Sequence, residues 1–331
     1  MVTTDLNAVS LPDLYCPFPD AIHPRAGEIE ERMMCWAVER GLPLDAIHEK
    51  RIRRTRWGVL VARSFPSGAF EPTLLFAKLY VLVSEYDQIF VEEPASAGEP
   101  TRTASNLLRL LTIVNDPDCI LPQDATAWER AWQVWMLDFQ AVATPFQHTR
   151  FLAGMAEYCM GGACEAIYRG RQEQPPVAEY LAIRRFTAGL RLSFVTAPIE
   201  IANGYEISPT LWHRPDVMDL TKTHQTVYGY TNDILSCLRD PQMGLPTALA
   251  LKYDWTLQRA IDTVARMLRE ETDAFIRLSD QVRARGPVPL PEYVDALQAC
   301  LAGHYAWYAD TGRYEISHRQ PSGSCQDGDS L

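Results

Sequence analysis

The feature that most constrains this chain is helical spacing of its apolar residues, which recurs over most of its length between proline stops. Ile29, Met33, Trp36 and Ala37 follow one another at spacings of four, three and one residues, and Gly41 ends that stretch. Such a stripe is typical of an amphipathic helix closed by glycine. No segment alternates apolar and polar residues between hairpin turns, so the pattern predicts an all-α fold.

The same spacing predicts about ten helices in one domain over residues 27–316. No internal repeat of fixed period divides the chain. We expect an extended, proline-rich arm over residues 1–26 and a disordered tail over residues 317–331. The further helices are expected near 44–64, 71–93, 102–115, 124–145, 148–170, 176–193, 208–239, 243–280 and 290–309.

Charge and composition exclude several classes of function. The formal net charge of −11 disfavours binding to nucleic acid or to an anionic membrane surface. No apolar window is long enough for a transmembrane helix. None of the 8 cysteines forms a CxxC pair, and we interpret them as reduced thiols of a cytoplasmic protein. Phosphate-binding glycine loops and the GxSxG motif are also absent from the sequence.

A first cluster of polar residues lies at Asn232, Ser236 and Asp240. Steps of four residues keep all three side chains on one helix face. An amide oxygen, a hydroxyl and a carboxylate form an oxygen-only ligand set, which suits Mg²⁺. Arg239 adds a cation beside them. The alternative is a polar stripe on a solvated helix.

A second cluster is acidic and ends an apolar helical stretch: Glu85, Asp87, Glu92 and Glu93 lie within nine residues. Crowded carboxylates repel one another unless solvent or cations separate them. The segment therefore predicts either cation binding or an acidic helix end that faces water.

A third signal is the pair Arg184-Arg185 within an otherwise apolar helix. The guanidinium fork fits phosphate or carboxylate oxygens, and surface salt bridges are the alternative.

The order and spacing of these motifs resemble the class I terpene synthase family of bacterial type, over about residues 16–316. The triad Asn232/Ser236/Asp240 is similar to the family's asparagine/serine/acidic triad, although the family usually has Glu at the last position. Ala62-Arg63-Ser64-Phe65-Pro66 is similar to a stretch that precedes the family's aspartate-rich helix.

The resemblance also implies that the helices surround a central cavity, and it implies roles for single residues. Arg185 is expected to sense the diphosphate, with Ala188 and Gly189 in the linker and effector positions. Arg239, Arg313 and Tyr314 are expected to bind the diphosphate. Cavity-wall candidates are Tyr80, Phe90, Phe186 and Trp307, each of which is equally typical of plain core.

The aspartate-rich motif departs from the family pattern. Asp87 aligns with the first aspartate, Gln88 replaces the second, and Glu92 takes the trailing acidic position. The amide oxygen of Gln88 can still bind a metal but brings no charge. An alternative alignment makes Glu85 the leading ligand.

The resemblance implies a carbon–oxygen lyase that ionises a prenyl diphosphate with three Mg²⁺ ions and cyclises the carbocation to a hydrocarbon or alcohol. Farnesyl diphosphate is the first expectation for the substrate and geranylgeranyl diphosphate the second. A homodimer is one option for the assembly. Two alternatives remain: a prenyl diphosphate chain-elongation enzyme, against which the triad argues, and a non-catalytic scaffold in which Gln88 marks a degraded metal site.

Overall fold

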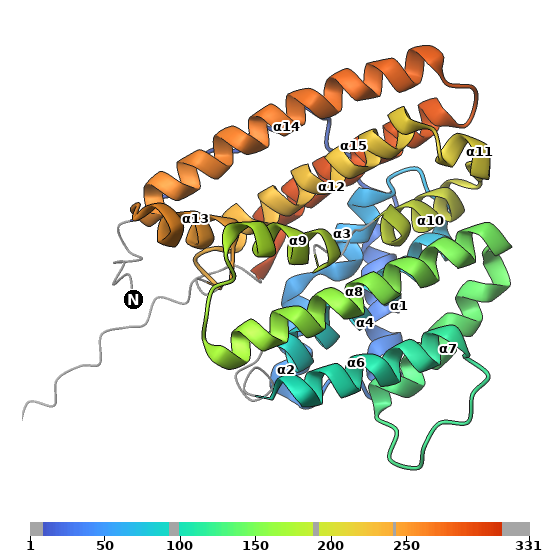
Figure 1. Cartoon of the computed structure of the whole chain (residues 1–331). Helices are drawn as coiled ribbons and strands as arrows, with labels where there is room; N and C mark the ends of the chain where they lie inside the picture. Colours follow the sequence, from blue (N-terminus) through green and yellow to red (C-terminus); the bar gives the residue numbers. More distant parts are fainter. Residues whose placement is uncertain (1–8, 93–98, 188–191, 241–242, 313–331) are drawn as a thin grey trace, which may run out of the picture.

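The computed structural model describes residues 9–92, 99–187, 192–240 and 243–312, and every regular element in these ranges is helical (Figure 1). The expected all-α fold is thereby confirmed. The elements are α1 (Ala26–Glu39), α2 (Ala46–Thr55), α3 (Trp57–Ser64), α4 (Phe70–Asp87), the π-helix η2 (Gln88–Glu92), α6 (Pro100–Asn115), α7 (Ala127–Val142), α8 (Pro145–Arg171), α9 (Val177–Thr187), α10 (Leu192–Asn203), α11 (Pro209–Trp212), α12 (Pro215–Ser236), α13 (Leu245–Tyr253), α14 (Leu257–Arg285) and α15 (Leu290–Asp310).

Three of the expected helices are broken in the structure. Arg56 has a left-handed backbone with φ of 59° and divides the segment expected near 44–64 into α2 and α3. Asp254, with φ of 53°, separates α13 from α14 in the same way. His213 and Arg214 separate the short α11 from α12, which begins at Pro215. Non-glycine residues rarely adopt this left-handed backbone, so nothing in the sequence marks the first two breaks.

Helix α10 lies almost wholly outside the predicted helices, and Pro198 lies within it. A proline in a helix interior removes a backbone donor and normally ends the helix. Here the helix packs against α8 and α4, and also contacts α12 and α15. Tertiary packing therefore outweighs the local cost of the proline.

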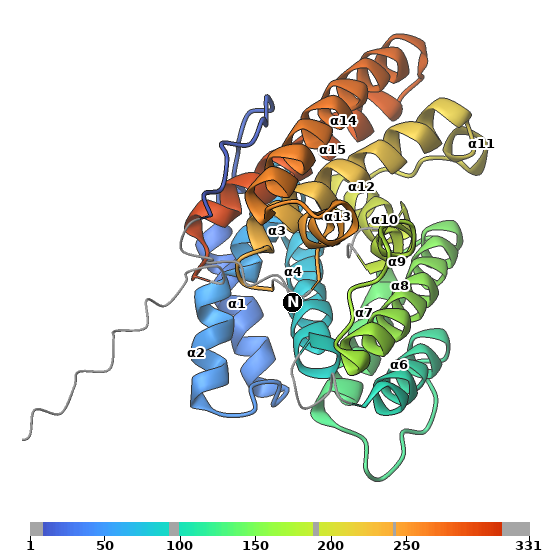
Figure 2. The same cartoon turned by 60° about the vertical axis from the view of Figure 1, so that its left-hand side comes forward.

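Six helices supply the described lining of one cavity, with a short turn after the last residue of α12. These helices are α3, α4, α8, α9, α12 and α15. The long helix α14 covers the outer side of α12 and α13, and α6 and α7 lie on the opposite side of the molecule (Figures 1 and 2). The cavity-lining helices are therefore held from both sides by an outer layer.

An aromatic core fixes α4 against α7 and α8. Trp135 stacks on Phe139 with ring centroids 5.2 Å apart and packs at a tilt against Phe151 with centroids 5.3 Å apart. Its indole nitrogen donates to the carbonyl oxygen of Leu75 at 2.8 Å. Full burial of each such side chain contributes on the order of 2 kcal/mol, so this cluster anchors α4, which carries Asp87.

Glycine allows α15 to approach α3 closely. A Cβ atom on Gly303 would lie 2.7 Å from the carbonyl carbon of Arg63. The two backbones therefore touch at this crossing, which brings Trp57 and Trp307 together at the cavity. Any larger residue at Gly303 would push the two helices apart.

The described part of the N-terminal arm lies along α14. Ser10 and Gln258 exchange backbone and side-chain hydrogen bonds at 2.9 and 3.0 Å. The ring of Phe18 packs edge-on against Phe275, with centroids 5.6 Å apart. None of the described helices combines the length and apolar character that crossing a bilayer requires.

Candidate active site

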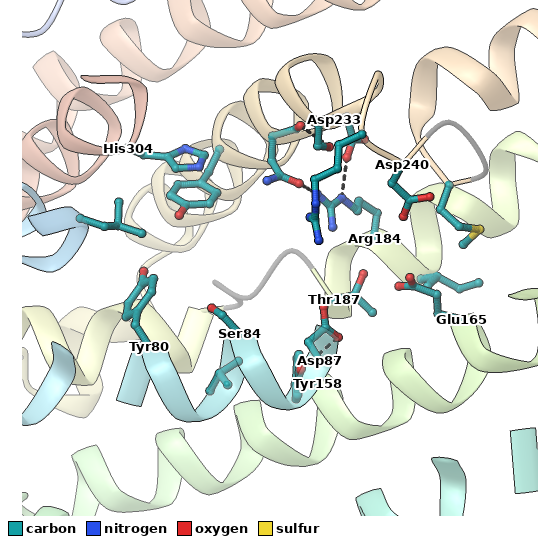
Figure 3. Close-up of a pocket in the computed structure, with 18 of the residues that line it drawn as sticks. Tyr80, Ser84, Asp87, Tyr158, Glu165, Arg184, Thr187, Asp233, Asp240 and His304 are labelled. Atoms are coloured by element: carbon teal, nitrogen blue, oxygen red, sulfur yellow. Dashed lines mark hydrogen bonds and ion pairs between the residues drawn. The ribbon is translucent and has the colours of Figure 1, made fainter. Parts of the chain in front are cut away.

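The cavity has a polar side and an aromatic side (Figure 3). Asp87 and Tyr158 lie across the cavity from Arg184 and Asp233, while His304 and Tyr80 lie further along it. Charged groups thus gather on one part of the wall and rings on another. Such a division suits a ligand with an anionic head and an apolar body.

Asn232, Ser236 and Asp240 all line the cavity. Asn232 and Ser236 belong to the last turns of α12, and the Asp240 backbone N–H donates to the Ser236 carbonyl oxygen at 2.9 Å. The helical hydrogen-bond spacing therefore continues past the end of α12. This continuation keeps the three oxygen-bearing side chains on one face, as their four-residue spacing predicts.

Arg184 on α9 is bonded to the same helix end. Its Nε lies 2.8 Å from Asp233 Oδ1, and its Nη2 donates to Asn232 Oδ1. Tyr180 donates to the other Asp233 oxygen at 2.8 Å. Burial raises the pKa of the Asp233 carboxyl, and the Arg184 guanidinium opposes that effect. This buried pair joins α9 to α12.

A second arginine holds the last residue of the triad. Arg169 Nη2 on α8 lies 2.5 Å from Asp240 Oδ2 and 2.8 Å from Glu165 Oε1. The Arg169 side chain is only 7% exposed, so little solvent screens these contacts. Arg169 thereby links α8 to the turn that follows α12.

Asp87 is the last residue of α4 and lies across the cavity from Asp233 (Figure 3). Tyr158 donates to its Oδ1 at 3.2 Å. Gln88 begins the π-helix and is absent from the described cavity lining. A π-helical turn directs side chains differently from an α-helix and is frequent at functional sites.

The aromatic side of the cavity contains Trp57, Tyr80, Tyr228, His304 and Trp307. His304 stacks on Tyr228 with nearly parallel rings, 3.4 Å between centroids. Burial, and then His224 and Arg184, hold the pKa of His304 well below its ordinary value. The imidazole is therefore neutral near pH 7, and this wall carries no cation that would repel a positively charged ligand.

Several of the predicted site residues lie elsewhere. Arg185 is exposed and does not line the cavity. Phe90 packs against Tyr86 with centroids 4.4 Å apart, and Phe186 packs against Gly161 of α8. Glu85 is fully buried and bonded to donors on α2 and α3.

Other predictions cannot be placed. Ala188, Gly189, Arg313 and Tyr314 lie outside the described residues, as does the side chain of Glu92.

The charges of the cavity lining indicate what a highly anionic ligand would require. The described lining holds four carboxylates and three guanidinium groups. With His304 neutral, its formal net charge is 3 − 4 = −1. A diphosphate group would add further negative charge, so additional cations are needed to hold it. The lining residues that carry this charge are Asp87, Glu165, Asp233, Asp240, Arg169, Arg184 and Arg239.

The triad fits a hard divalent cation. Its side chains offer only oxygen, as Mg²⁺ prefers. Asn232 Oδ1 and Asp240 Oδ2 each accept from a guanidinium, so both oxygens already face positive charge. Among the described residues, no group of three or more His, Cys, Asp or Glu side chains could hold a metal. A metal would therefore depend on the amide and hydroxyl oxygens, which suit Mg²⁺ better than zinc.

Comparison with known proteins identifies the family. The family model described as "Terpene synthase family 2, C-terminal metal binding" matches residues 78–274, which include Asp87 and the whole triad. This chain belongs to the terpene synthase family. The resemblance inferred from the motifs is thereby confirmed, and this terpene synthase is a lyase of class I.

Relatives of this terpene synthase match over nearly their whole length. A sesquiterpene synthase of Metarhizium brunneum is 30% identical, over 93% of this chain and 90% of that protein. A corvol ether synthase of Kitasatospora setae, named as cyclising (2E,6E)-farnesyl diphosphate, is 27% identical, over 92% of this chain and 95% of that protein.

Solved structures share the fold of this terpene synthase. The protein SVS_A2, obtained by ancestral sequence reconstruction, gives a TM-score of 0.84 at 24% identity, over 91% of this chain and 90% of that chain. The 2-methylisoborneol synthase of Streptomyces coelicolor was solved with Mg²⁺ and 2-fluoroneryl diphosphate. It gives a TM-score of 0.82 at 22% identity, over 93% of this chain and 99% of that chain. These likenesses support the helical architecture around the cavity.

The structure of this terpene synthase adds site residues that sequence reasoning missed. The sequence predicts phosphate or carboxylate recognition for the pair Arg184-Arg185, but the resemblance assigns the sensing role to Arg185, and one helical step of about 100° separates the directions of the two side chains. Arg169 and Glu165 lie on α8, in a segment without any motif. Only tertiary packing brings them to Asp240, so no local signal could have found them.

Proposed function

We propose that this enzyme ionises farnesyl diphosphate in a Mg²⁺-dependent reaction and cyclises the resulting carbocation to a sesquiterpene hydrocarbon or alcohol, with release of diphosphate. The observation that carries the proposal is the division of one cavity into a wall of oxygens and guanidinium groups and a wall of aromatic rings. Relatives named as sesquiterpene synthases support the substrate assignment. The family assignment does not favour chain elongation or a scaffold without catalysis.

In this proposal, Asn232, Ser236 and Asp240 hold one Mg²⁺, and Asp87 holds metal from the opposite wall. Bound Mg²⁺ supplies Lewis-acid and electrostatic stabilisation of the leaving diphosphate. A cation on Asn232 Oδ1 competes with Arg184 for that oxygen, since Arg184 Nη2 donates to it. Nη2 of Arg184 would then be available to the diphosphate, while its Nε keeps the ion pair with Asp233.

We assign diphosphate recognition to Arg184, Arg169 and Arg239, all of which line the cavity. This assignment transfers to Arg184 the role that the motif alignment gives to Arg185, because Arg185 is exposed. Guanidinium groups bind phosphate oxygens through paired N–H donors. They also neutralise the charge that develops on the leaving group.

The aromatic wall is proposed to hold the hydrocarbon part of the substrate. Ring faces attract a carbocation through their quadrupole, as they attract other cations. The neutral His304 and its neighbours bring no positive charge that would oppose the cation. Exclusion of water from this part of the cavity protects the cation from early quenching.

The substrate assignment is tested by measuring kcat/KM separately for geranyl, farnesyl and geranylgeranyl diphosphates, with purified protein and Mg²⁺. The proposal predicts the highest kcat/KM for farnesyl diphosphate. A higher value for geranylgeranyl diphosphate would replace the C15 assignment by C20. Addition of isopentenyl diphosphate tests chain elongation, which would give longer prenyl diphosphates.

A further inference from the structure

Two stacked tryptophans form part of the aromatic wall. Trp57 is the first residue of α3, and Trp307 lies near the end of α15. Their ring centroids are 5.1 Å apart with an interplanar angle of 22°, and both side chains line the cavity. Tyr80 of α4 tilts against Trp57 at 6.4 Å. The orientation of Trp57 therefore determines which ring surface the cavity presents at this point.

The indole N–H of Trp57 is bound by a buried carboxylate. Trp57 Nε1 donates to Glu85 Oε1 at 3.0 Å, and the Glu85 side chain is 0% exposed. A carboxylate buried to this degree is costly unless several donors satisfy it. Trp57 is therefore one part of a network that must be satisfied as a unit.

Helix α2 supplies the other donors to Glu85. His48 Nε2 lies 3.0 Å from Glu85 Oε2, and Arg51 Nη2 lies 3.4 Å from the same oxygen. The backbone N–H of Leu44 donates to His48 Nδ1 at 3.1 Å, so Nδ1 is an acceptor. The hydrogen of a neutral His48 ring is therefore on Nε2, and that nitrogen donates to Glu85.

Glu85 and Asp87 point in opposite directions although only Tyr86 separates them. Two helical steps of about 100° turn their side chains roughly 200° apart on α4. Asp87 lines the cavity, whereas Glu85 faces α2 and α3. The acidic segment therefore has two functions on two helix faces, and Glu85 is not in position to bind a cation in the cavity.

The same corner of the fold also holds the second tryptophan. Trp307 Nε1 donates to the carbonyl oxygen of Thr55 at 2.8 Å, at the end of α2. Arg56 follows with its left-handed backbone and starts α3 at Trp57. Both indole N–H groups are thus fixed at the junction of α2, α3 and α4.

We propose that Glu85 is a positioning residue of the cyclisation reaction, which fixes the Trp57 indole so that the Trp57–Trp307 stack keeps its place in the cavity wall. The inference rests on the proposed function. It predicts that loss of Glu85 changes how the carbocation partitions among products, because the cation–π contact moves. It also predicts no change in the Mg²⁺ concentration that gives half-maximal activity.

The test compares Glu85→Leu, Glu85→Gln and Trp57→Phe by product analysis with farnesyl diphosphate and by Mg²⁺ titration. We expect Glu85→Leu to raise the share of acyclic and other early-quenched products by about fivefold. A change of this size corresponds to the loss of one cation–π contact. Glu85→Gln should keep the product profile closer to wild type than Glu85→Leu does, because its amide oxygen can accept from Trp57 although its NH2 group then faces the donors of His48 and Arg51. Glu71→Leu, at an exposed glutamate of the same helix, is the matched control.

A double variant of Glu85 and Trp57 tests most sharply whether the two residues act through the same contact. The double variant Glu85→Leu/Trp57→Phe should shift the products no further than Trp57→Phe alone, since both changes remove one contact. Additive shifts would overturn the inference. So would a raised Mg²⁺ requirement in Glu85→Gln with unchanged products, which would make Glu85 a metal ligand.

A measurement without substrate separates this inference from the proposed function. In protein labelled with ¹⁵N at tryptophan, the Trp57 indole resonance is assigned by its loss in Trp57→Phe. We expect Glu85→Leu to shift that resonance and Glu85→Gln to retain it near its wild-type position. An unshifted resonance in folded Glu85→Leu would overturn the positioning of Trp57 by Glu85, whatever reaction the enzyme catalyses. Absence of any terpene from wild-type protein would instead overturn the proposed function, and with it the role in cyclisation, even if the resonance shifts as expected.

Discussion

Arg184 Nε lies 2.8 Å from Asp233 Oδ1, in an ion pair where the two side chains are 19% and 3% exposed. The pair joins α9 to α12 beside the first residue of the triad. Because Arg184 also donates to Asn232, one guanidinium orients both a structural carboxylate and a proposed metal ligand. We therefore expect substitutions of Arg184 to affect both stability and catalysis.

Arg184 and Arg185 should respond very differently to substitution. We expect Arg184→Ala to lower kcat/KM by on the order of 100-fold and stability by about 3 kcal/mol, because Asp233 is left buried without its partner. Arg185→Ala, at the exposed neighbour, should stay within about threefold of wild type. Steady-state kinetics and urea unfolding check both statements. A larger loss of activity in Arg185→Ala would return the diphosphate-sensing role to that residue.

Asp87→Ala and Asn232→Ala should each abolish turnover while leaving the helical content intact. Both substitutions remove an oxygen that is proposed to bind Mg²⁺, without creating a large cavity in the core. Asn203→Ala, at an exposed position at the end of α10, is the matched control. Product formation and far-ultraviolet circular dichroism provide the two readouts. Full activity in either variant contradicts the metal assignments.

Asp240→Asn should raise the Mg²⁺ concentration for half-maximal activity by about tenfold, since the variant keeps an oxygen ligand but loses its charge. It should also release Arg169, which lies 2.5 Å from the Asp240 carboxylate. Activity measured over a Mg²⁺ series checks the prediction. An unchanged Mg²⁺ requirement would mean that Asp240 serves only to hold Arg169.

Stability should depend on pH through Glu30, which accepts from the Val59 backbone N–H at 3.0 Å. Burial raises the pKa of Glu30 to about 7 from an ordinary value of 4.5, although hydrogen bonds from Val59 and Gly58 oppose the effect. The folded state therefore binds more protons between these values, and stability falls as pH rises from 4.5 through about 7.

Glu30→Gln should remove that dependence. Relative to this variant, we expect wild-type protein to lose up to about 3 kcal/mol of unfolding free energy between pH 4.5 and pH 8. Urea unfolding at both pH values measures the difference, with Glu31→Gln at an exposed position as the control. An equal difference at both pH values would show that Glu30 does not titrate in this range.

Periodic features were predictable from the sequence, whereas contacts between helices were not. The four-residue spacing of Asn232, Ser236 and Asp240 predicts a shared face, and all three line the cavity. The choice between Arg184 and Arg185 depends on how α9 rotates against α12, which spacing cannot show. Likewise, the acidic segment does not reveal that Glu85 and Asp87 face different partners.

The most direct test of the account is product analysis of purified wild-type protein incubated with farnesyl diphosphate, with Mg²⁺ in one sample and with a chelator in the other. Extracts are analysed by gas chromatography and mass spectrometry, and released diphosphate is quantified. The account predicts a cyclic C15 hydrocarbon or alcohol, together with diphosphate, only when Mg²⁺ is present. A folded protein that releases neither product in the presence of Mg²⁺, or that forms the same product with chelator, would contradict it.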